Sequence, residues 1–237
     1  MRVAALSDIH GNLRALEAVL AEIEREDVDA IVVVGDTVAG PWPVEVFDRV
    51  TGLGDSIVRG NADRAVLERD DRFGRNPSWC AELLGDERLA ALARWPLTYE
   101  LAIDELGSVL FCHSTPSADD PIYTRLTPED DLLELFSEVD ADVVVCGHTH
   151  MQYDRKLASG LRIVNPGSVG LPYEGAHGAY WAVLGPGVDM RRSEYDARAT
   201  ADEIRALEAP VDRLLEHLLE PPDSETTTAY FESLRGA

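Results

Sequence analysis

The feature that most constrains the fold is a set of six short apolar runs, each ending at a polar or glycine-containing turn. The runs are rich in β-branched residues and do not alternate between polar and apolar, so they predict strands buried on both faces. They cover Val3–Leu6, Ile31–Val34, Ile57–Val58, Val109–Cys112, Val143–Cys146 and Ile163–Val164. A chain of 237 residues with this pattern suits one sizeable α/β domain.

Amphipathic segments separate several of these runs and predict helices. Residues 12–26 place apolar side chains at helical spacing behind Asn12, a favourable N-cap residue. Further helices are expected over Pro43–Val50, Ala81–Arg94 and Pro128–Val139, and proline in the first turn suits the first and last of these.

The pattern changes in the C-terminal third of the chain. Ala179–Leu184 and Val188–Tyr195 predict paired strands. Thr200–Leu219 predicts a final helix capped by Thr200, and Pro210 is compatible with a kink or a split in it. The polar tail from Pro221 is expected to be mobile, with Tyr230 and Phe231 as the residues that could dock it.

We find no linker that would separate two domains. The sequence therefore predicts one domain over residues 1–198, to which a C-terminal helix and acidic tail, residues 199–237, are appended.

The composition excludes two classes of partner. A formal net charge of −23 lacks the basic footprint needed to bind nucleic acid or an anionic membrane without specificity. No apolar run is long enough to cross a bilayer. The three cysteines are typical of small core residues in a reducing compartment, so we expect a cytoplasmic protein. The oligomeric state stays open, a homo-oligomer included.

The polar residues that follow the predicted strands are the most informative for function. They are Asp8, His10, Asp36, Asn61, His113, His148 and His150. In open α/β sheets the carboxyl ends of the strands form the binding crevice, so these side chains should converge. Aspartate, asparagine and histidine are ligands for divalent ions, and packing the carboxylates together without a cation would leave buried charge unpaired. The pattern therefore predicts a metal centre.

The order and spacing of these motifs resemble a known family. The motifs are Asp8-x-His10, Gly35-Asp36, Gly60-Asn61, the single His113 and Gly147-His148-x-His150, and together they resemble the calcineurin-like metallophosphoesterases. The downstream Asn165-Pro166-Gly167-Ser168-Val169-Gly170 is similar to the small single-domain prokaryotic phosphodiesterase branch. The resemblance covers about residues 1–195.

The resemblance implies a fold and a set of metal ligands. The fold is a four-layer α-β-β-α sandwich of two mixed sheets flanked by helices, whereas the strand pattern alone suggests a simple doubly wound sheet. Two divalent transition metal ions are implied, with Mn expected first and Fe, Zn, Ni or Co as alternatives. One ion would be held by Asp8, His10 and His150, the other by Asn61, His113 and His148, with Asp36 as the bridge. The residues implied in catalysis are Asp8, Asp36, Asn61, His113 and His148.

One position departs from the family pattern. Most of the superfamily places histidine directly after the metal-binding asparagine, where it is thought to donate a proton to the leaving group, but this chain has Ala62. General acid catalysis contributes about 10²–10⁴-fold, and stable leaving groups need it less. We therefore expect hydrolysis of phosphodiesters or nucleotide phosphoanhydrides, of the cyclic nucleotide or dinucleoside polyphosphate type, in preference to simple alkyl monoesters.

A small phosphoester or nucleotide is thus the expected substrate. The residues that we expect to contact it are Arg59, Arg64, Arg125 and Tyr173. The alternatives are a phosphoprotein or phosphomonoester phosphatase, a non-catalytic metal-binding scaffold on the same fold, and a module that binds a nucleotide without cleaving it.

Overall fold

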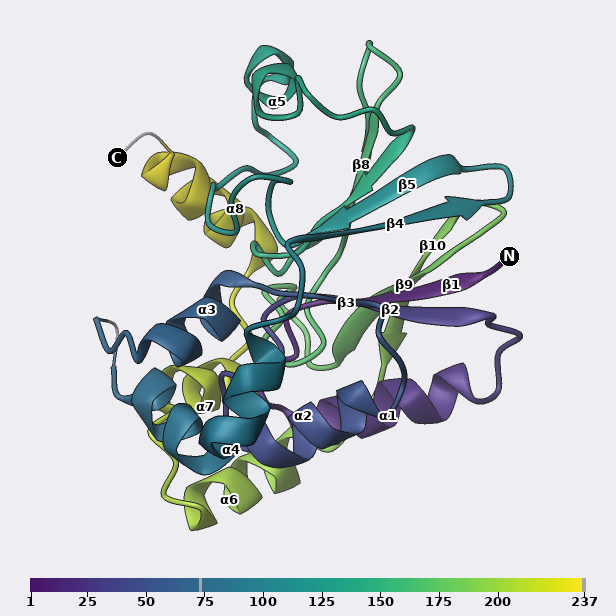
Figure 1. Cartoon of the computed structure of the whole chain (residues 1–237). Helices are drawn as coiled ribbons and strands as arrows, with labels where there is room; N and C mark the ends of the chain where they lie inside the picture. Colours follow the sequence, from purple (N-terminus) through teal and green to yellow (C-terminus); the bar gives the residue numbers. More distant parts are fainter. Residues whose placement is uncertain (73, 236–237) are drawn as a thin grey trace.

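Two mixed five-stranded sheets form the centre of the molecule, as the computed structural model of residues 1–72 and 74–235 shows (Figure 1). Their strand orders are β10-β9-β1-β2-β3 and β4-β5-β6-β8-β7. Helices α1, α2, α4 and α6 lie on the outer side of the first sheet, and α5 lies beyond the second (Figure 1). The four-layer sandwich is confirmed, and the simpler doubly wound sheet is wrong.

The first sheet contains three of the predicted strands in parallel. Strand β2 (Ala30–Val34) pairs with β1 (Val3–Leu6) on one side and with β3 (Ile57–Val58) on the other. On the other side of β1, the strand β9 (Ala179–Leu184) runs antiparallel, and β10 (Val188–Ser193) pairs with it. The predicted C-terminal strand pair is therefore confirmed.

The second sheet has a parallel centre and two antiparallel edges. Its centre consists of β5 (Gly107–Cys112), β6 (Val143–Val145) and β8 (Arg162–Pro166). The edges are β4 (Thr98–Ile103), which pairs with β5, and β7 (Gln152–Lys156), which pairs with β8. Neither edge strand was predicted, because their partly exposed, polar-rich sequences lack the apolar runs of the central strands.

The sheets bury apolar side chains against each other and against the helices. In β1, Val3 and Ala5 pack in the core between the sheets, whereas Ala4 and Leu6 pack in the core on the helical side. A strand that faces two cores needs apolar residues at every position. This explains why the strongest runs in the sequence do not alternate.

The described residues form eight helices; the four predicted over residues 12–139 are present, whereas those over Asn61–Glu68 and Ser224–Leu234 were not predicted. The helices are α1 (Leu13–Ile23), α2 (Pro43–Thr51), α3 (Asn61–Glu68), α4 (Asn76–Leu92), α5 (Glu129–Leu135), α6 (Ala197–Ala206), α7 (Asp212–Leu219) and α8 (Ser224–Leu234). The predicted cap of α1 is confirmed, since the Asn12 side chain accepts a hydrogen bond from the Ala15 N–H at 3.2 Å. Helix α4 begins earlier than expected and is interrupted at Gly85, where φ is 68°.

The C-terminal segment differs from the prediction. The predicted helix Thr200–Leu219 is split into α6 and α7, with Pro210 between them, and the predicted cap is wrong, because α6 is capped by Asp196 rather than Thr200. The cap is the Asp196 carboxylate, which accepts from the Ala199 N–H at 2.9 Å.

The tail that was expected to be mobile forms α8 through residue 234. This helix docks through Glu232, whose carboxylate accepts hydrogen bonds from the hydroxyls of Thr124 and Thr127 at 2.5 and 2.6 Å. Phe231 packs against the main core, and Tyr230 is exposed. The last two residues of the predicted tail lie outside the described part of the chain.

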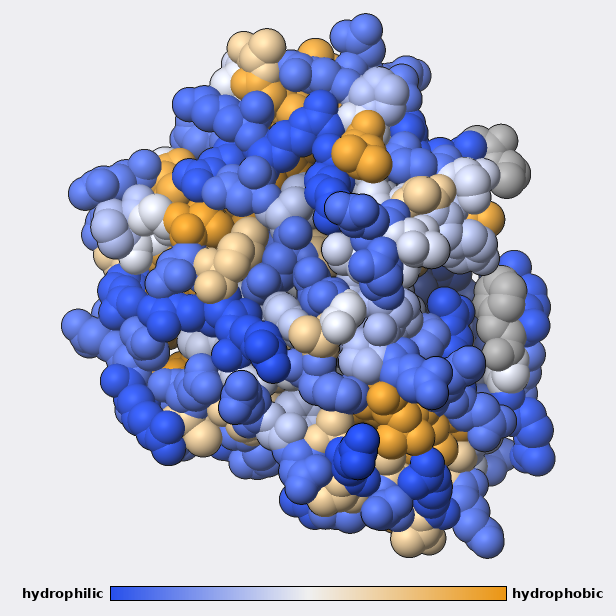
Figure 2. All heavy atoms as spheres, turned by 180° about the vertical axis from the view of Figure 1, so that it is seen from behind, coloured by the Kyte–Doolittle hydropathy of each residue, from blue (hydrophilic) through white to orange (hydrophobic). Residues whose placement is uncertain are grey.

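The surface reflects the acidic composition. The face seen in Figure 2 is predominantly hydrophilic, with hydrophobic side chains gathered in smaller patches. Among the described residues, no helix has the length and apolar character needed to span a membrane.

Candidate metal centre

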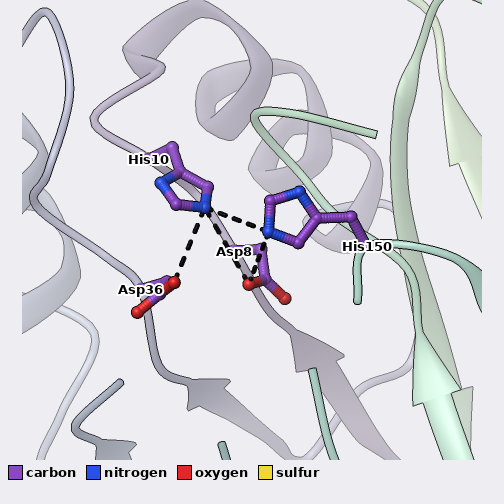
Figure 3. A group of neighbouring side chains, drawn as sticks. All are labelled: Asp8, His10, Asp36 and His150. Atoms are coloured by element: carbon purple, nitrogen blue, oxygen red, sulfur yellow. Dashed lines mark hydrogen bonds and ion pairs between the residues drawn. The ribbon is translucent and has the colours of Figure 1, made fainter. Parts of the chain in front are cut away.

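Four of the predicted ligands converge where the strands end. Donor atoms of Asp8, His10, Asp36 and His150 all lie within 4.8 Å of one another (Figure 3). The His150 Nε2 lies 3.1 Å from the Asp8 Oδ1, and the His10 Nε2 lies 3.7 Å from the Asp36 Oδ2. These side chains follow β1, β2 and β6, so the sheet rims bring together residues far apart in the sequence.

The other three predicted ligands form a second group beside Asp36. The His113 Nε2 lies 3.3 Å from the Asp36 Oδ2 and 2.9 Å from the Asn61 Oδ1. The His148 ring lies edge-on to the His113 ring, with centroids 5.4 Å apart. The His148 Nε2 is buried and has no hydrogen-bond partner within the described chain. All seven predicted ligands therefore gather around two groups of donors, with Asp36 next to both.

Backbone carbonyls orient two of the imidazoles. The Nδ1 of His113 lies 2.8 Å from the Val34 carbonyl oxygen, and the Nδ1 of His150 lies 2.7 Å from the Leu171 carbonyl oxygen. Because a carbonyl oxygen can only accept a hydrogen bond, each Nδ1 carries a proton. Each Nε2 therefore faces the cluster, as it does in metal-binding histidines.

The backbone at the cluster is held in an unfavourable conformation. Five of the seven residues have φ between 47° and 68°: Asp8, His10, Asp36, His148 and His150. A non-glycine residue in this left-handed region costs free energy of order 1–3 kcal/mol and persists only where its surroundings fix it. Such strain is concentrated at functional sites, and its repetition at successive turns supports a functional cluster.

The start of α3 holds the carboxylate that lies between the two groups. The N–H of Ala62 donates to the Asp36 Oδ1 at 2.6 Å, so a helix-start donor that lacks a partner in its own helix binds this carboxylate. A Cβ on Gly60 would overlap the same carboxylate. Glycine before Asn61 is therefore required by close packing, and alanine after Asn61 still contributes through its backbone.

Asp63 fixes the turn that carries Asp36. Its buried carboxylate accepts hydrogen bonds from the N–H groups of Thr37 and Val38 at 2.9 and 3.0 Å and from the Gly60 N–H at 3.0 Å. These bonds tie the segment after β2 to the start of α3. Asp63 is thus a positioning residue for the cluster.

The Asn165–Gly170 motif also supports the cluster. The Asn165 Nδ2 donates to the Gly147 carbonyl oxygen at 2.6 Å, directly before His148. The Ser168 hydroxyl donates to the Asp8 carbonyl oxygen at 2.7 Å and accepts from the Leu171 N–H at 2.8 Å. Sequence reasoning used this motif only as part of a resemblance, because its contacts to residues more than 150 positions away are not visible in the sequence.

The electrostatics of the cluster favour a bound cation. Burial raises the pKa of Asp36, but the His113 imidazole more than offsets this and holds it well below its usual range. Asp8 is likewise shifted down by His150 against the effect of burial on its pKa. Burial, and then a neighbouring histidine, lowers the pKa of His10 and of His148 to about 4. Two carboxylates are therefore charged and the His10 and His148 imidazoles neutral at pH 7. Asp36 and Asp8 outweigh the effect of burial on His113 and raise its pKa to about 10, so a cation bound there would take the place of its Nε2 proton.

Of the four residues predicted to contact substrate, Arg64 alone is among those that line the cleft beside the metal cluster. Its guanidinium is held by the Asp119 carboxylate at 2.8–3.1 Å. Tyr173 is buried and stacks on the His150 ring, with centroids 4.7 Å apart. Neither Arg59 nor Arg125 is among the residues that line the cleft, so their contact with substrate stays a prediction.

The cleft has a volume of about 790 Å³ and opens from the donor cluster. His10, Asn61 and Leu171 line its metal side, and Arg213 and Leu214 of α7 line another wall. Sequence reasoning missed the contribution of α7, because no local pattern relates this helix to turns at the other end of the chain.

A two-sheet sandwich with carboxylate, amide and imidazole donors at the strand ends defines the metal-dependent phosphoesterase class. The chain belongs to the calcineurin-like phosphoesterase superfamily, whose domain model matches residues 1–184. The family resemblance is confirmed, and a phosphoesterase with a divalent-metal site follows from it.

Three relatives indicate the branch. An uncharacterized protein of Methanocaldococcus jannaschii, MJ0912, is 28% identical over 228 residues, which cover 85% of this chain and 91% of the relative. The phosphodiesterase YfcE of Escherichia coli is 26% identical over 191 residues, covering 76% and 85%. The crystal structure of a metallophosphoesterase from Sphaerobacter thermophilus matches with a TM-score of 0.74 and 28% identity, covering 93% and 99%.

Proposed function

We propose that this protein is a dinuclear-metal-dependent phosphoester hydrolase that prefers phosphodiesters or nucleotide phosphoanhydrides to alkyl phosphomonoesters. The observation that carries the proposal is the convergence of four donor residues within 4.8 Å, with Asp36 shared by a second group of donors. The family membership and the printed function of the YfcE relative support it.

The residues present fit two divalent ions. One ion would be held by Asp8, His10 and His150. The other would be held by Asn61, His113 and His148, and Asp36 would be shared by both. The buried His148 Nε2, which lacks a hydrogen-bond partner within the described chain, is the kind of atom that a metal would satisfy. The donors are nitrogen and oxygen without thiolate, a set that suits Mn and also accepts Fe, Zn, Ni or Co.

The donor cluster suits phosphoryl chemistry. Two ions bound there would supply Lewis-acid stabilisation of the charge that develops on the phosphoryl oxygens. The protein's contribution is to fix the ligands through Asp63, Ser168 and the first turn of α3. The buried turns that carry Asp8 and Asp36 have strained backbones held by these contacts, so the ligands are already in place and need not reorganise during the reaction.

The preference for stable leaving groups rests on Ala62. Its methyl group lines the cleft and can neither donate nor accept a proton, and its N–H is already used by Asp36. An alkoxide leaving from a monoester needs a proton, whereas a phenolate or a nucleoside phosphate leaves without one. The position next to Asn61 therefore favours diesters and phosphoanhydrides.

The test compares bis-p-nitrophenyl phosphate with an alkyl monoester, glycerol 2-phosphate, using protein that is first chelated and then reloaded with Mn²⁺. We expect metal-dependent hydrolysis of the diester and a weaker rate on the monoester. A monoester rate equal to or above the diester rate would contradict the preference and favour a monoester phosphatase. Metal binding without hydrolysis of either ester or of a dinucleoside polyphosphate would contradict the enzymatic role and favour a scaffold.

A further inference from the structure

Helix α7, which lies beyond the matched family domain, forms part of the wall of the cleft beside the metal cluster. Val211, Arg213 and Leu214 line the cleft from this segment. The cleft is within the 300–1,000 Å³ range of sites that hold drug-sized ligands, so it can accept much more than a single phosphate.

A chain of aromatic contacts connects α7 to the metal cluster. Tyr173 stacks on the His150 ring, and His217 of α7 contacts the tyrosine ring edge-on, with centroids 5.4 Å apart. Burial raises the pKa of the Tyr173 phenol, and the nearby Arg213 guanidinium partly offsets this. Arg213 therefore lies near Tyr173, which contacts the His150 ring, while its own side chain is exposed in the cleft.

The charges around the cleft differ from those of the protein as a whole. The chain is strongly acidic, yet two of the cleft aspartates are already paired, Asp70 with Arg72 at 2.6 Å and Asp120 with Arg64 at 3.2 Å. Arg75 and Arg213 also line the cleft, and over residues 1–72 and 74–235 no ion pair is formed by either side chain.

Asp212 is the remaining acidic residue of the cleft wall, so two arginines without a carboxylate partner face one aspartate. A guanidinium that is exposed in a cleft and lacks a carboxylate partner is suited to bind phosphate oxygens through its fork of donors.

We infer that Arg213 binds an anionic group of the substrate other than the reacting phosphate, and so selects substrates that carry a second phosphate, the class that includes nucleoside polyphosphates. This inference rests on the proposed function, because it places the reacting phosphate at the metal cluster. Leu171, Val211 and Leu214 provide apolar surface for the organic group of such a substrate. Arg75 supplies a second cationic contact from the residue before α4.

The test is a binding measurement on Mn²⁺-loaded protein with two probes. The first is α,β-methylene-ADP, which cannot be hydrolysed at its bridge and carries two phosphoryl groups, and the second is inorganic phosphate, which is too small to bridge the metal cluster and a separate anion site. Arg213→Gln should weaken binding of the nucleotide analogue about tenfold more than binding of phosphate. Arg213→Lys should recover part of the loss, and Arg75→Gln should act in the same direction.

The matched control is Arg198→Gln, which removes an exposed arginine of α6 that does not line the cleft. It should leave the affinity for both probes unchanged. Equal losses for both probes in Arg213→Gln would overturn the inference, since they would mean that the residue only supports Tyr173 and His150. No loss for either probe would overturn it as well.

The proposed function and this inference fail in different ways. If the protein hydrolyses no phosphoester but binds the analogue through Arg213, the proposed function is wrong and the binding role of Arg213 stands. If the protein hydrolyses phosphodiesters and Arg213→Gln behaves like Arg198→Gln, the inference alone is wrong.

Discussion

The backbone N–H of Ala62 donates a hydrogen bond to the Asp36 Oδ1 at 2.6 Å. The carboxylate that lies between the two groups of donors is therefore fixed by a residue whose side chain has no chemistry of its own. Position 62 therefore has two separate roles: its backbone N–H holds Asp36, and its side chain faces the cleft. A substitution can change the side chain without removing the N–H.

Ala62→His should raise the rate on an alkyl monoester such as glycerol 2-phosphate relative to the diester bis-p-nitrophenyl phosphate. An imidazole at this position can donate a proton to the leaving group, and general acid catalysis contributes about 10²–10⁴-fold, so we expect a relative gain of about 10²-fold on alkyl monoesters. Steady-state kinetics on matched monoester and diester substrates measure it. Ala62→Gln adds bulk without a titratable group and serves as the control; an equal gain in both variants would refute the proton-transfer account.

Asp63→Asn should weaken metal binding without changing a ligand. An amide presents one oxygen where the carboxylate presents two, so part of the hydrogen bonding to Thr37, Val38 and Gly60 is lost. Loss of such supporting contacts reduces metal affinity by about 10–100-fold. Metal titration calorimetry measures the change, and Asp86→Asn, at an exposed position of α4, is the control. Identical affinities in the two variants would contradict the positioning role.

Ser168→Ala should destabilise the fold. The hydroxyl is fully buried and both donates to the Asp8 carbonyl and accepts from the Leu171 N–H, so its removal leaves two buried groups unpaired. The expected loss in the free energy of unfolding is about 1–3 kcal/mol. Urea denaturation measures it, with Ser117→Ala at an exposed loop position as the comparison. A free energy of unfolding equal to that of the comparison variant would show that the motif does not hold the cluster.

Removal of metal should lower thermal stability. A ligand that binds only the folded state stabilises it by about 2.7 kcal/mol at one hundred times its dissociation constant. For a chain of this size each kcal/mol shifts the melting temperature by about 2–4 °C, so chelation should lower it by several degrees. Differential scanning calorimetry with and without EDTA measures the shift. An unchanged melting temperature after confirmed metal removal would contradict a metal-stabilised site.

The central strands and the ligand set could be predicted from the sequence because both depend on local signals. A strand buried on both faces needs a continuous apolar run, and a ligand cluster at strand ends needs polar residues directly after those runs. Asp8 after Leu6 and His113 after Cys112 show both signals in adjacent positions. The structure places both side chains at the cluster.

Other parts of the fold depend on contacts that the sequence does not display. The edge strand Gln152–Lys156 pairs only on one side, so its polar residues carry no strand signal. Pro210 was compatible with either a kink or a break, and packing of α6 and α7 decides for the break. After that break, α7 lies against Tyr173 through His217 and presents Arg213 to the cleft.

The measurement that tests the central claim most directly is the metal content of the protein after reloading with Mn²⁺ and removal of free metal. Elemental analysis should find two ions per chain, and phosphodiester hydrolysis should follow the occupancy of both. Asp36→Asn should reduce the content and abolish hydrolysis, because Asp36 lies next to both groups of donors. One ion or none per wild-type chain, or two ions with unchanged activity in Asp36→Asn, would contradict the dinuclear centre.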